Sequence, residues 1–404
     1  MSSYSHRGYE QRTSGYGRRR HKASGFKRKP TGGESAKGFV IFLLIIFAAA
    51  LVFVFFKYLK PFVNSFSDKE LTEVIETFDV APPDSPDTPV GEFDKVDDKI
   101  FVSNGNGYLM FKGIDDTAVN YAATLNSIVS SLDSDITVYN MVIPTNTEFG
   151  LSGDMSMYTN SQRANLDKIS SALMDSVINV DLYKTLDLHS GEYIYYRTDE
   201  SLTSLGAYYV YREFAQRADF NPDYIYSLEK LSEKKGSIGR FEGSFIARTT
   251  DEIIQPHGNQ ELFNNADSID FYKLPVHYNC DRIDIKTGDR IETDLFTTDN
   301  AVYDPLSVFP AKDTELLEIS NEENNNDEKL LIVKDHIGEP VIGYLIPAYD
   351  EVYVVDAQLY KENLSEYIRS NDITQVLILS GIADANNSLY CQRLRDLFDS
   401  SISG

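Results

Sequence analysis

The sequence predicts an α/β fold, a parallel sheet flanked by helices, that carries a β-rich insertion and is preceded by one transmembrane helix. From about residue 99 onward, short apolar runs alternate with segments of helical periodicity, which is typical of a parallel sheet covered on both faces. This rhythm breaks over residues 219–328, where hairpin-like segments indicate the insertion. The uncharged run Phe39–Phe56 is long enough to cross a bilayer as a helix.

The N-terminal region predicts a membrane anchor. Residues 1–37 contain ten Lys/Arg and two Asp/Glu among many Gly and Ser residues, so we expect a disordered tail. The basic flank of a transmembrane helix stays in the cytoplasm. We therefore expect the tail in the cytoplasm, a transmembrane helix at 38–58 in the cell membrane, and the C-terminal domain outside the cytoplasm. A buried core helix is disfavoured because the run is apolar on every side. A cleaved signal peptide is disfavoured because the run is long and no small-residue cleavage site follows.

Residues 59–98 are expected to connect the membrane to the folded domain. A capping box, Ser67–Glu70, precedes apolar residues at helical spacing and predicts a short membrane-proximal helix. The Pro- and Asp-rich stretch after it is typical of an extended linker. The folded domain is then predicted to occupy residues 99–404.

The elements of this domain are predicted from periodicity and turn signals. A hairpin is expected where Ile100–Ser103 and Tyr108–Phe111 flank Asn104–Gly107. A second hairpin is expected over Arg282–Ile291, within the insertion. The other predicted strands are Thr137–Ile143, Val177–Leu182, Leu330–Lys334, Val352–Val355 and Val376–Leu379. The predicted helices are 117–132, 159–176, 203–217 with Thr203 as N-cap, 337–345, 359–368 and 386–398.

Charge and cysteine content exclude several functions. The net charge is −24, and the part that follows the apolar run is strongly acidic, so it would repel nucleic acid. Cys280 and Cys391 are too far apart for a CxxC motif, and the sequence leaves open whether they are two buried thiols or one disulfide. Because no Cys/His cluster has ligand spacing, we expect no metal site and no cofactor.

Polar residues follow several predicted strands, where open α/β sheets place their active groups. Thr145 comes after the first strand of the parallel sheet, Asp181 lies at the end of the second, and the stretch Asp199–Thr203 precedes a helix. Asp335 and His336 lie between a strand and a helix. These segments are the candidate site, with Thr145, Asp181 and Asp335 as candidate binding residues.

Two of these segments resemble the DHHW family, which is related to alginate O-acetyltransferase proteins within the SGNH-hydrolase group. Arg197–Ala207 (RTDESLTSLGA) is similar to the family's R-T-D-H-H-W-T-x-x-G-A, and Leu331–His336 (LIVKDH) to its strand followed by K-D-S. Further similar segments are Tyr139–Thr145, Val180–Leu182, Gly243–Phe245, Pro347–Tyr349, Glu351–Asp356 and Ile373–Leu379. The resemblance spans about residues 99–382 and implies an SGNH-like domain.

The resemblance also implies which residues would form a catalytic triad. Asp199 is retained, but Ser201 stands where the family has its histidine base and His336 where it has its serine nucleophile. Serine cannot act as a base near neutral pH. A swapped pair, with Ser201 as nucleophile and His336 as base, is an alternative. It is disfavoured because exchanging a short and a long side chain displaces the hydroxyl from its inherited position.

The resemblance therefore predicts a catalytically degenerate DHHW-like protein. We expect a binding or scaffolding component in cell-envelope or surface-polysaccharide modification. Its implied partners are a surface polysaccharide and a polytopic membrane O-acyltransferase or an active paralogue. The alternative is an O-acyltransferase or acyl esterase that uses Asp199, Ser201 and His336 on a surface glycan.

Overall fold

The computed structural model describes residues 99–151, 153–220, 235–248, 253, 257–274, 276–298 and 304–399. The chain divides into two compact units, Met1–Pro86 and Asp87–Gly404, and every described residue belongs to the second. The predicted tail, transmembrane helix, membrane-proximal helix and linker lie outside the described residues. Within the described part, no helix combines the length and the apolar character needed to span a membrane.

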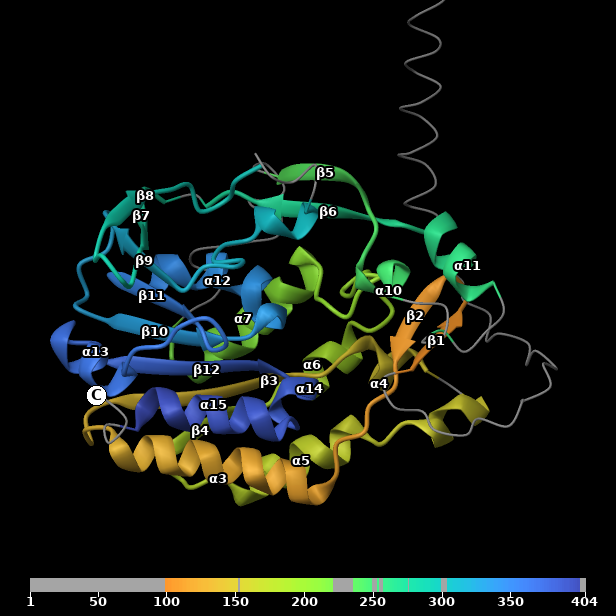
Figure 1. The fold of residues 1–404 in the computed structure, drawn as a ribbon, viewed down its shortest axis with the longest axis horizontal. Coiled ribbons are helices and arrows are strands. Elements are labelled where there is room, and N and C mark those ends of the chain that lie inside the picture. The colour runs from red at the N-terminus through yellow and green to blue at the C-terminus, as the bar shows by residue number, and fades with distance from the viewer. Residues whose placement is uncertain are drawn as a thin grey trace, which may run out of the picture. The chain divides into compact units, whose positions relative to one another are not determined.

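A mixed sheet of eight strands forms the centre of the second unit (Figure 1). Its strands are β3 (Thr137–Ile143), β4 (Val177–Val180), β7 (Tyr278–Ile283), β8 (Arg290–Glu292), β9 (Leu316–Asn321), β10 (Lys329–Lys334), β11 (Glu351–Asp356) and β12 (Gln375–Gly381). The spatial order is β4-β3-β12-β10-β11-β9-β7-β8. The strands from β4 to β11 run parallel, and the strands from β11 to β8 pair antiparallel.

The α/β fold is confirmed, but the prediction of a parallel sheet is correct only for the five strands from β4 to β11. Strands β7, β8 and β9 come from the segment predicted as an insertion, and they extend the same sheet in antiparallel pairing. The expected hairpin over Arg282–Ile291 is confirmed, since β7 and β8 pair around a tight turn. Such a hairpin needs only a short connection, whereas each parallel pair needs a crossover.

Helices cover both faces of the sheet (Figure 1). The helices that pack on the sheet include α3 (Asp115–Ser131), α5 (Gln162–Ala172), α7 (Ser204–Arg217), α12 (Glu339–Leu345), α13 (Leu364–Ser370) and α15 (Ser388–Phe398). On one face α3, α5, α13 and α15 pack against alternate strand residues such as Val138 and Val333. On the other face α7 and α12 pack against the intervening residues, such as Tyr139 and Ile332. This alternation is the period-two pattern of a buried strand.

The two cysteines are free and buried in different layers of this core. Cys280 lies in the core on the side of α7, and Cys391 lies in the core on the side of α15. They therefore do not form the disulfide that the sequence left open. Burial and nearby carboxylates raise the pKa of the Cys280 thiol to about 12, which keeps it protonated and unreactive near neutral pH.

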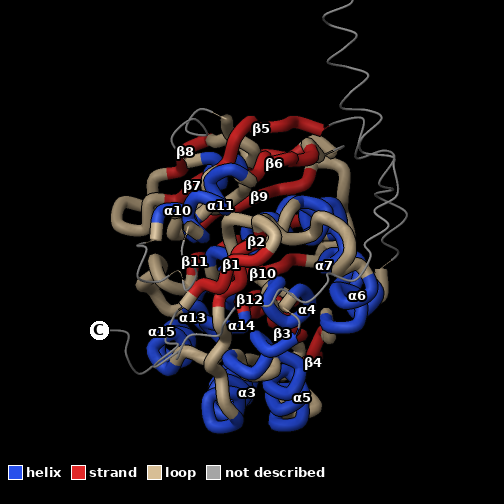
Figure 2. The backbone as a smooth tube through the Cα atoms, turned by 90° about the vertical axis from the view of Figure 1, so that its right-hand side faces the viewer, coloured by secondary structure: helices blue, strands red, loops and turns tan. Residues whose placement is uncertain are grey.

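Shorter elements surround the sheet (Figure 2). The N-terminal hairpin is confirmed, but its second strand, β2 (Asn106–Leu109), begins two residues before the predicted Tyr108. Strand β1 (Ile100–Ser103) joins it through Asn104 and Gly105 alone, both at positive φ. A second two-stranded sheet pairs β5 (Lys235–Phe241) with β6 (Asp267–Tyr272). The short helices are α4 (Asn146–Gly150), η2 (Gly153–Tyr158), α6 (Tyr183–Leu188), α10 (Ser244–Ala247), α11 (Gly258–Asn264), η3 (Pro305–Val308), η4 (His336–Gly338), η5 (Ile346–Ala348) and α14 (Ile382–Ala385).

Side-chain caps decide where several helices begin. The Thr203 hydroxyl accepts from the Gly206 N–H, which confirms the predicted N-cap of α7. Helix α13 starts at Leu364 rather than at the expected residue 359, because the Asn363 side chain caps it. The single helix predicted over residues 386–398 begins later, at Ser388, where Asn387 caps α15, and the short helix α14 precedes it.

Candidate functional site

The candidate site lies at the carboxyl ends of the parallel strands. Asp335 and His336 follow β10, and Gly381 ends the neighbouring strand β12. The segment Asp199–Ser201 reaches the same region from the loop before α7, because Glu200 contacts His336. The topology thus brings together segments that are more than a hundred residues apart in the sequence.

Asp199 is a buried carboxylate whose two oxygens are both occupied. Its Oδ1 accepts the Ser201 N–H at 3.0 Å and the Ser201 hydroxyl at 2.7 Å. Its Oδ2 accepts the Ser244 N–H, at the start of α10, at 2.8 Å. Ser201 itself is only 3% exposed. The hydroxyl of Ser201 is therefore tied to Asp199, in the position where a triad carboxylate would hold an imidazole.

His336 points to a different partner. Its Nε2 lies 3.4 Å from Glu200 Oε1, and its side chain is about half exposed. Among the described residues, no hydrogen bond joins His336 to Ser201. Burial opposes the charged ring, but the bond to Glu200 and the charges of Asp335, Glu200 and Asp384 raise the pKa of His336 to about 10. The neighbouring carboxylates thus favour the cationic form of the imidazole.

Asp335 is fully buried and joins the ends of the two central strands. Its Oδ1 accepts the Ile337 N–H at 2.9 Å, which caps η4, and its Oδ2 accepts the Gly381 N–H at 2.6 Å. Asp384, on α14, lies beside it. Burial, the Asp335 charge and a hydrogen bond to Asp335 raise the pKa of Asp384 to about 7. Burial and the mutual repulsion of the two carboxylates therefore favour protonation of one of them.

The two other candidate binding residues lie in different places. Thr145 is buried and lines a pocket of about 190 Å³, which Glu200 also lines. Its N–H and hydroxyl are both bonded to the Gln162 amide. Asp181 instead lies on the surface, where it forms an ion pair with Arg163 at 3.4 Å and accepts from the Tyr183 N–H. The structure thus brings Thr145 to the site and leaves Asp181 outside it.

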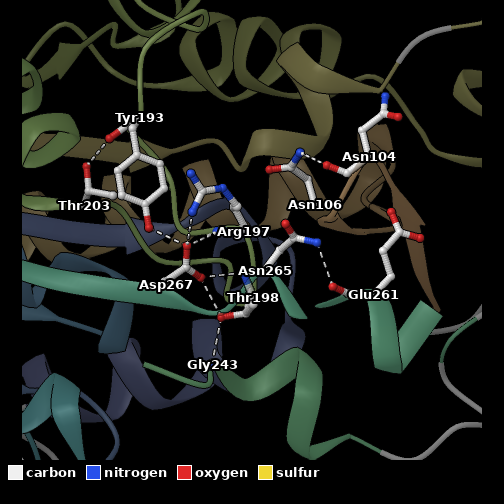
Figure 3. A network of polar contacts seen from close by, with 10 residues as sticks. All are labelled: Asn104, Asn106, Tyr193, Arg197, Thr198, Thr203, Gly243, Glu261, Asn265 and Asp267. Carbon is white, nitrogen blue, oxygen red and sulfur yellow. Dashed lines mark hydrogen bonds and ion pairs between the residues drawn. The ribbon is translucent and has the colours of Figure 1, made fainter. Parts of the chain in front are cut away.

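Asp267, on β6, holds in place the motif loop, which comprises Arg197–Thr203 (Figure 3). This buried carboxylate accepts the Thr198 N–H at 2.8 Å and the Thr198 hydroxyl at 2.6 Å. It also accepts the Arg197 N–H at 3.1 Å and the Tyr193 hydroxyl. The Thr198 hydroxyl in turn accepts the Gly243 N–H. Asp199 is positioned by this network, since it directly follows Thr198.

A buried cluster of three charged side chains lies next to the candidate site. Lys334 is completely buried, and its Nζ lies 3.0 Å from Glu339 Oε1 and 2.9 Å from Asp356 Oδ2. Burial opposes the charge of Lys334, but the two carboxylates raise its pKa. Burial raises the pKa of Glu339, and Lys334 opposes that rise. Lys334 thus remains charged and ties β10 to β11 and α12, immediately before the site.

Sequence reasoning missed two residues of this region. Asp384 follows the last parallel strand within a few residues, so the rule that sites gather after strands would have found it. Asp267 lies far from the motif in the sequence, and no local pattern signals that it binds Thr198. Glu200 was inside the motif, but only the structure shows that its carboxylate contacts His336.

A helix-flanked mixed sheet with this motif loop at its strand ends defines an α/β domain. A family model described as "DHHW protein" matches residues 91–355, and the chain belongs to this family. A comparison with curated proteins finds no match.

Several solved structures are similar to this one. A DHHW family protein from Eubacterium siraeum has a TM-score of 0.64 at 27% identity, covering 74% of this chain and 95% of that one. Bacillus cereus PatB1 with a sulfonyl adduct has a TM-score of 0.55 at 14% identity, covering 72% and 97%. The second likeness concerns the fold alone.

Proposed function

We propose that this chain is a catalytically degenerate DHHW protein that serves as a binding or scaffolding component in surface-polysaccharide modification. The observation that carries the proposal is the bond from the Ser201 hydroxyl to Asp199. In a triad that carboxylate orients an imidazole, which then activates a serine. Here the carboxylate holds a hydroxyl, and the imidazole of His336 lies against Glu200.

The alternative is acyl transfer or ester hydrolysis by Asp199, Ser201 and His336. This reaction needs a base within hydrogen-bond reach of the Ser201 hydroxyl. The hydroxyl is buried and donates to Asp199, so it is neither open to a substrate nor bonded to the imidazole. The geometry therefore favours the binding role over the enzyme.

Covalent labelling tests the proposal. A fluorophosphonate or a sulfonyl fluoride, the latter suggested by the sulfonyl adduct of PatB1, should leave Ser201 of the purified chain unlabelled. The purified chain should also hydrolyse nitrophenyl acetate no faster than its Ser201→Ala variant. As a control for access, the double variant Ser201→His with His336→Ser carries the family's residue types at both positions. Labelling of Ser201 in the unmodified chain would establish the enzyme instead.

The proposed anchor and partners rest on the apolar run Phe39–Phe56 and on the family resemblance. We expect the chain to stay in the membrane pellet after a carbonate wash, because an 18-residue apolar helix inserts stably. After mild detergent extraction it should co-purify with a polytopic O-acyltransferase or an active paralogue. Release of the chain by carbonate would contradict the anchor, and capture of the chain alone would contradict the scaffolding role.

A further inference from the structure

We propose that Asp335, His336 and Asp384 form a binding site for one divalent transition-metal cation of the Zn²⁺ or Mn²⁺ type. Each residue offers one ligand atom, and these atoms all lie within 4.8 Å of one another. The proposal goes beyond the binding role inferred above, because it assigns a ligand to the position where the family resemblance places a nucleophile.

The spacing of the three ligand atoms is close to that of a metal centre. In a tetrahedral zinc site with bonds of about 2.1 Å, ligand atoms lie about 3.4 Å apart. Since the ligand atoms lie within 4.8 Å of one another, closing the present site requires each pair to approach by at most about 1.4 Å. The His336 side chain is about half exposed, so it is not locked into the core. Asp384 is also only partly buried.

Asp335 supplies a ligand that is already fixed. Backbone N–H groups of Ile337 and Gly381 hold its two oxygens at 2.9 and 2.6 Å. Each carboxylate oxygen keeps a further lone pair for a cation. Metal ligands are commonly oriented by hydrogen bonds of this kind. Glu200 plays the same part for the imidazole, since it contacts Nε2 of His336.

The donor atoms select the class of ion. Three carboxylates, those of Glu200, Asp335 and Asp384, lie around one imidazole, and a metal that binds here displaces one proton from that imidazole. A nitrogen donor beside two carboxylates suits Zn²⁺ or Mn²⁺, whereas Ca²⁺ and Mg²⁺ take sets of oxygen ligands.

Titration of the full-length chain with metal ions tests the site. After treatment with EDTA, calorimetry with ZnCl₂ and MnCl₂ should show one site per chain. Asp384→Asn and His336→Ala should each weaken binding at least tenfold. The matched control is His277→Ala, which removes an exposed histidine that also contacts a carboxylate, Glu323, and binding should not change. Thermal unfolding of each metal-free variant shows whether it is folded.

Two results would overturn the proposed metal site, and a third would overturn the assigned class of ion. Absence of binding to the folded chain, or binding that survives Asp384→Asn and His336→Ala, overturns the proposal. Binding of Ca²⁺ in preference to both transition metals overturns the assigned class. Because labelling of Ser201 involves no metal, either proposal can fail while the other stands.

Discussion

Replacing Lys334 by Met is expected to lower the free energy of unfolding by about 3–5 kcal/mol, because breaking a buried ion pair from one side leaves an uncompensated charge. The ammonium is completely buried between Glu339 and Asp356, at 3.0 and 2.9 Å. Methionine keeps the length of the side chain but leaves two buried carboxylates without a cation. Urea unfolding at pH 7, followed by circular dichroism, measures the loss.

Two further variants isolate the cause of that loss. Lys329→Met removes a lysine at the other end of the same strand, where it pairs with Glu351 in a more exposed position. It should cost no more than about 1 kcal/mol. Combining Lys334→Met with Glu339→Gln and Asp356→Asn removes the uncompensated charges and should recover most of the loss. A triple variant as unstable as Lys334→Met would show that packing, rather than charge, is responsible.

The second large effect is expected from Asp267→Ala, which should cost about 3 kcal/mol, because each buried donor left without an acceptor costs roughly 1–3 kcal/mol and these costs are not additive. The carboxylate accepts two backbone N–H groups and the hydroxyls of Thr198 and Tyr193. Its loss also frees the loop that carries Asp199. Chemical denaturation measures the stability, and hydrogen exchange at the Thr198 and Ser201 amides reports on the loop.

A neighbouring aspartate on the same strand provides the control. Asp270 is considerably more exposed and contacts Lys235 and Ser237. Asp270→Ala should cost less than about 1 kcal/mol and leave exchange at the Thr198 amide unchanged. If Asp267→Ala and Asp270→Ala have equal effects, the buried network does not hold the motif loop.

Much of the fold could be predicted because its signals are local. Apolar runs such as Leu330–Val333 are buried on both faces of the sheet, and the order of strands and helices follows from their alternation. The turn at Asn104 and Gly105 was likewise predicted from adjacent residues. The antiparallel extension by β7, β8 and β9 was not predicted, because edge pairing depends on contacts between segments far apart in the chain.

The candidate site, too, could be predicted only in part from the sequence. The altered motif positions, Ser201 and His336, are visible in the sequence, and so is the retained Asp199. Their contacts are not. The bond from Ser201 to Asp199 and the orientation of His336 toward Glu200 follow from packing around the loop.

The sequence by itself determined the α/β class, the parallel core, the resemblance to the DHHW family and the changes of residue type at the inherited catalytic positions. All of these depend on short stretches of chain. Only the tertiary structure decided that Asp267 anchors the motif loop and that Asp384 lies beside Asp335 and His336. The physical reason is that the carboxyl ends of parallel strands meet at one edge of the sheet, so residues distant in sequence become neighbours only when the sheet is assembled.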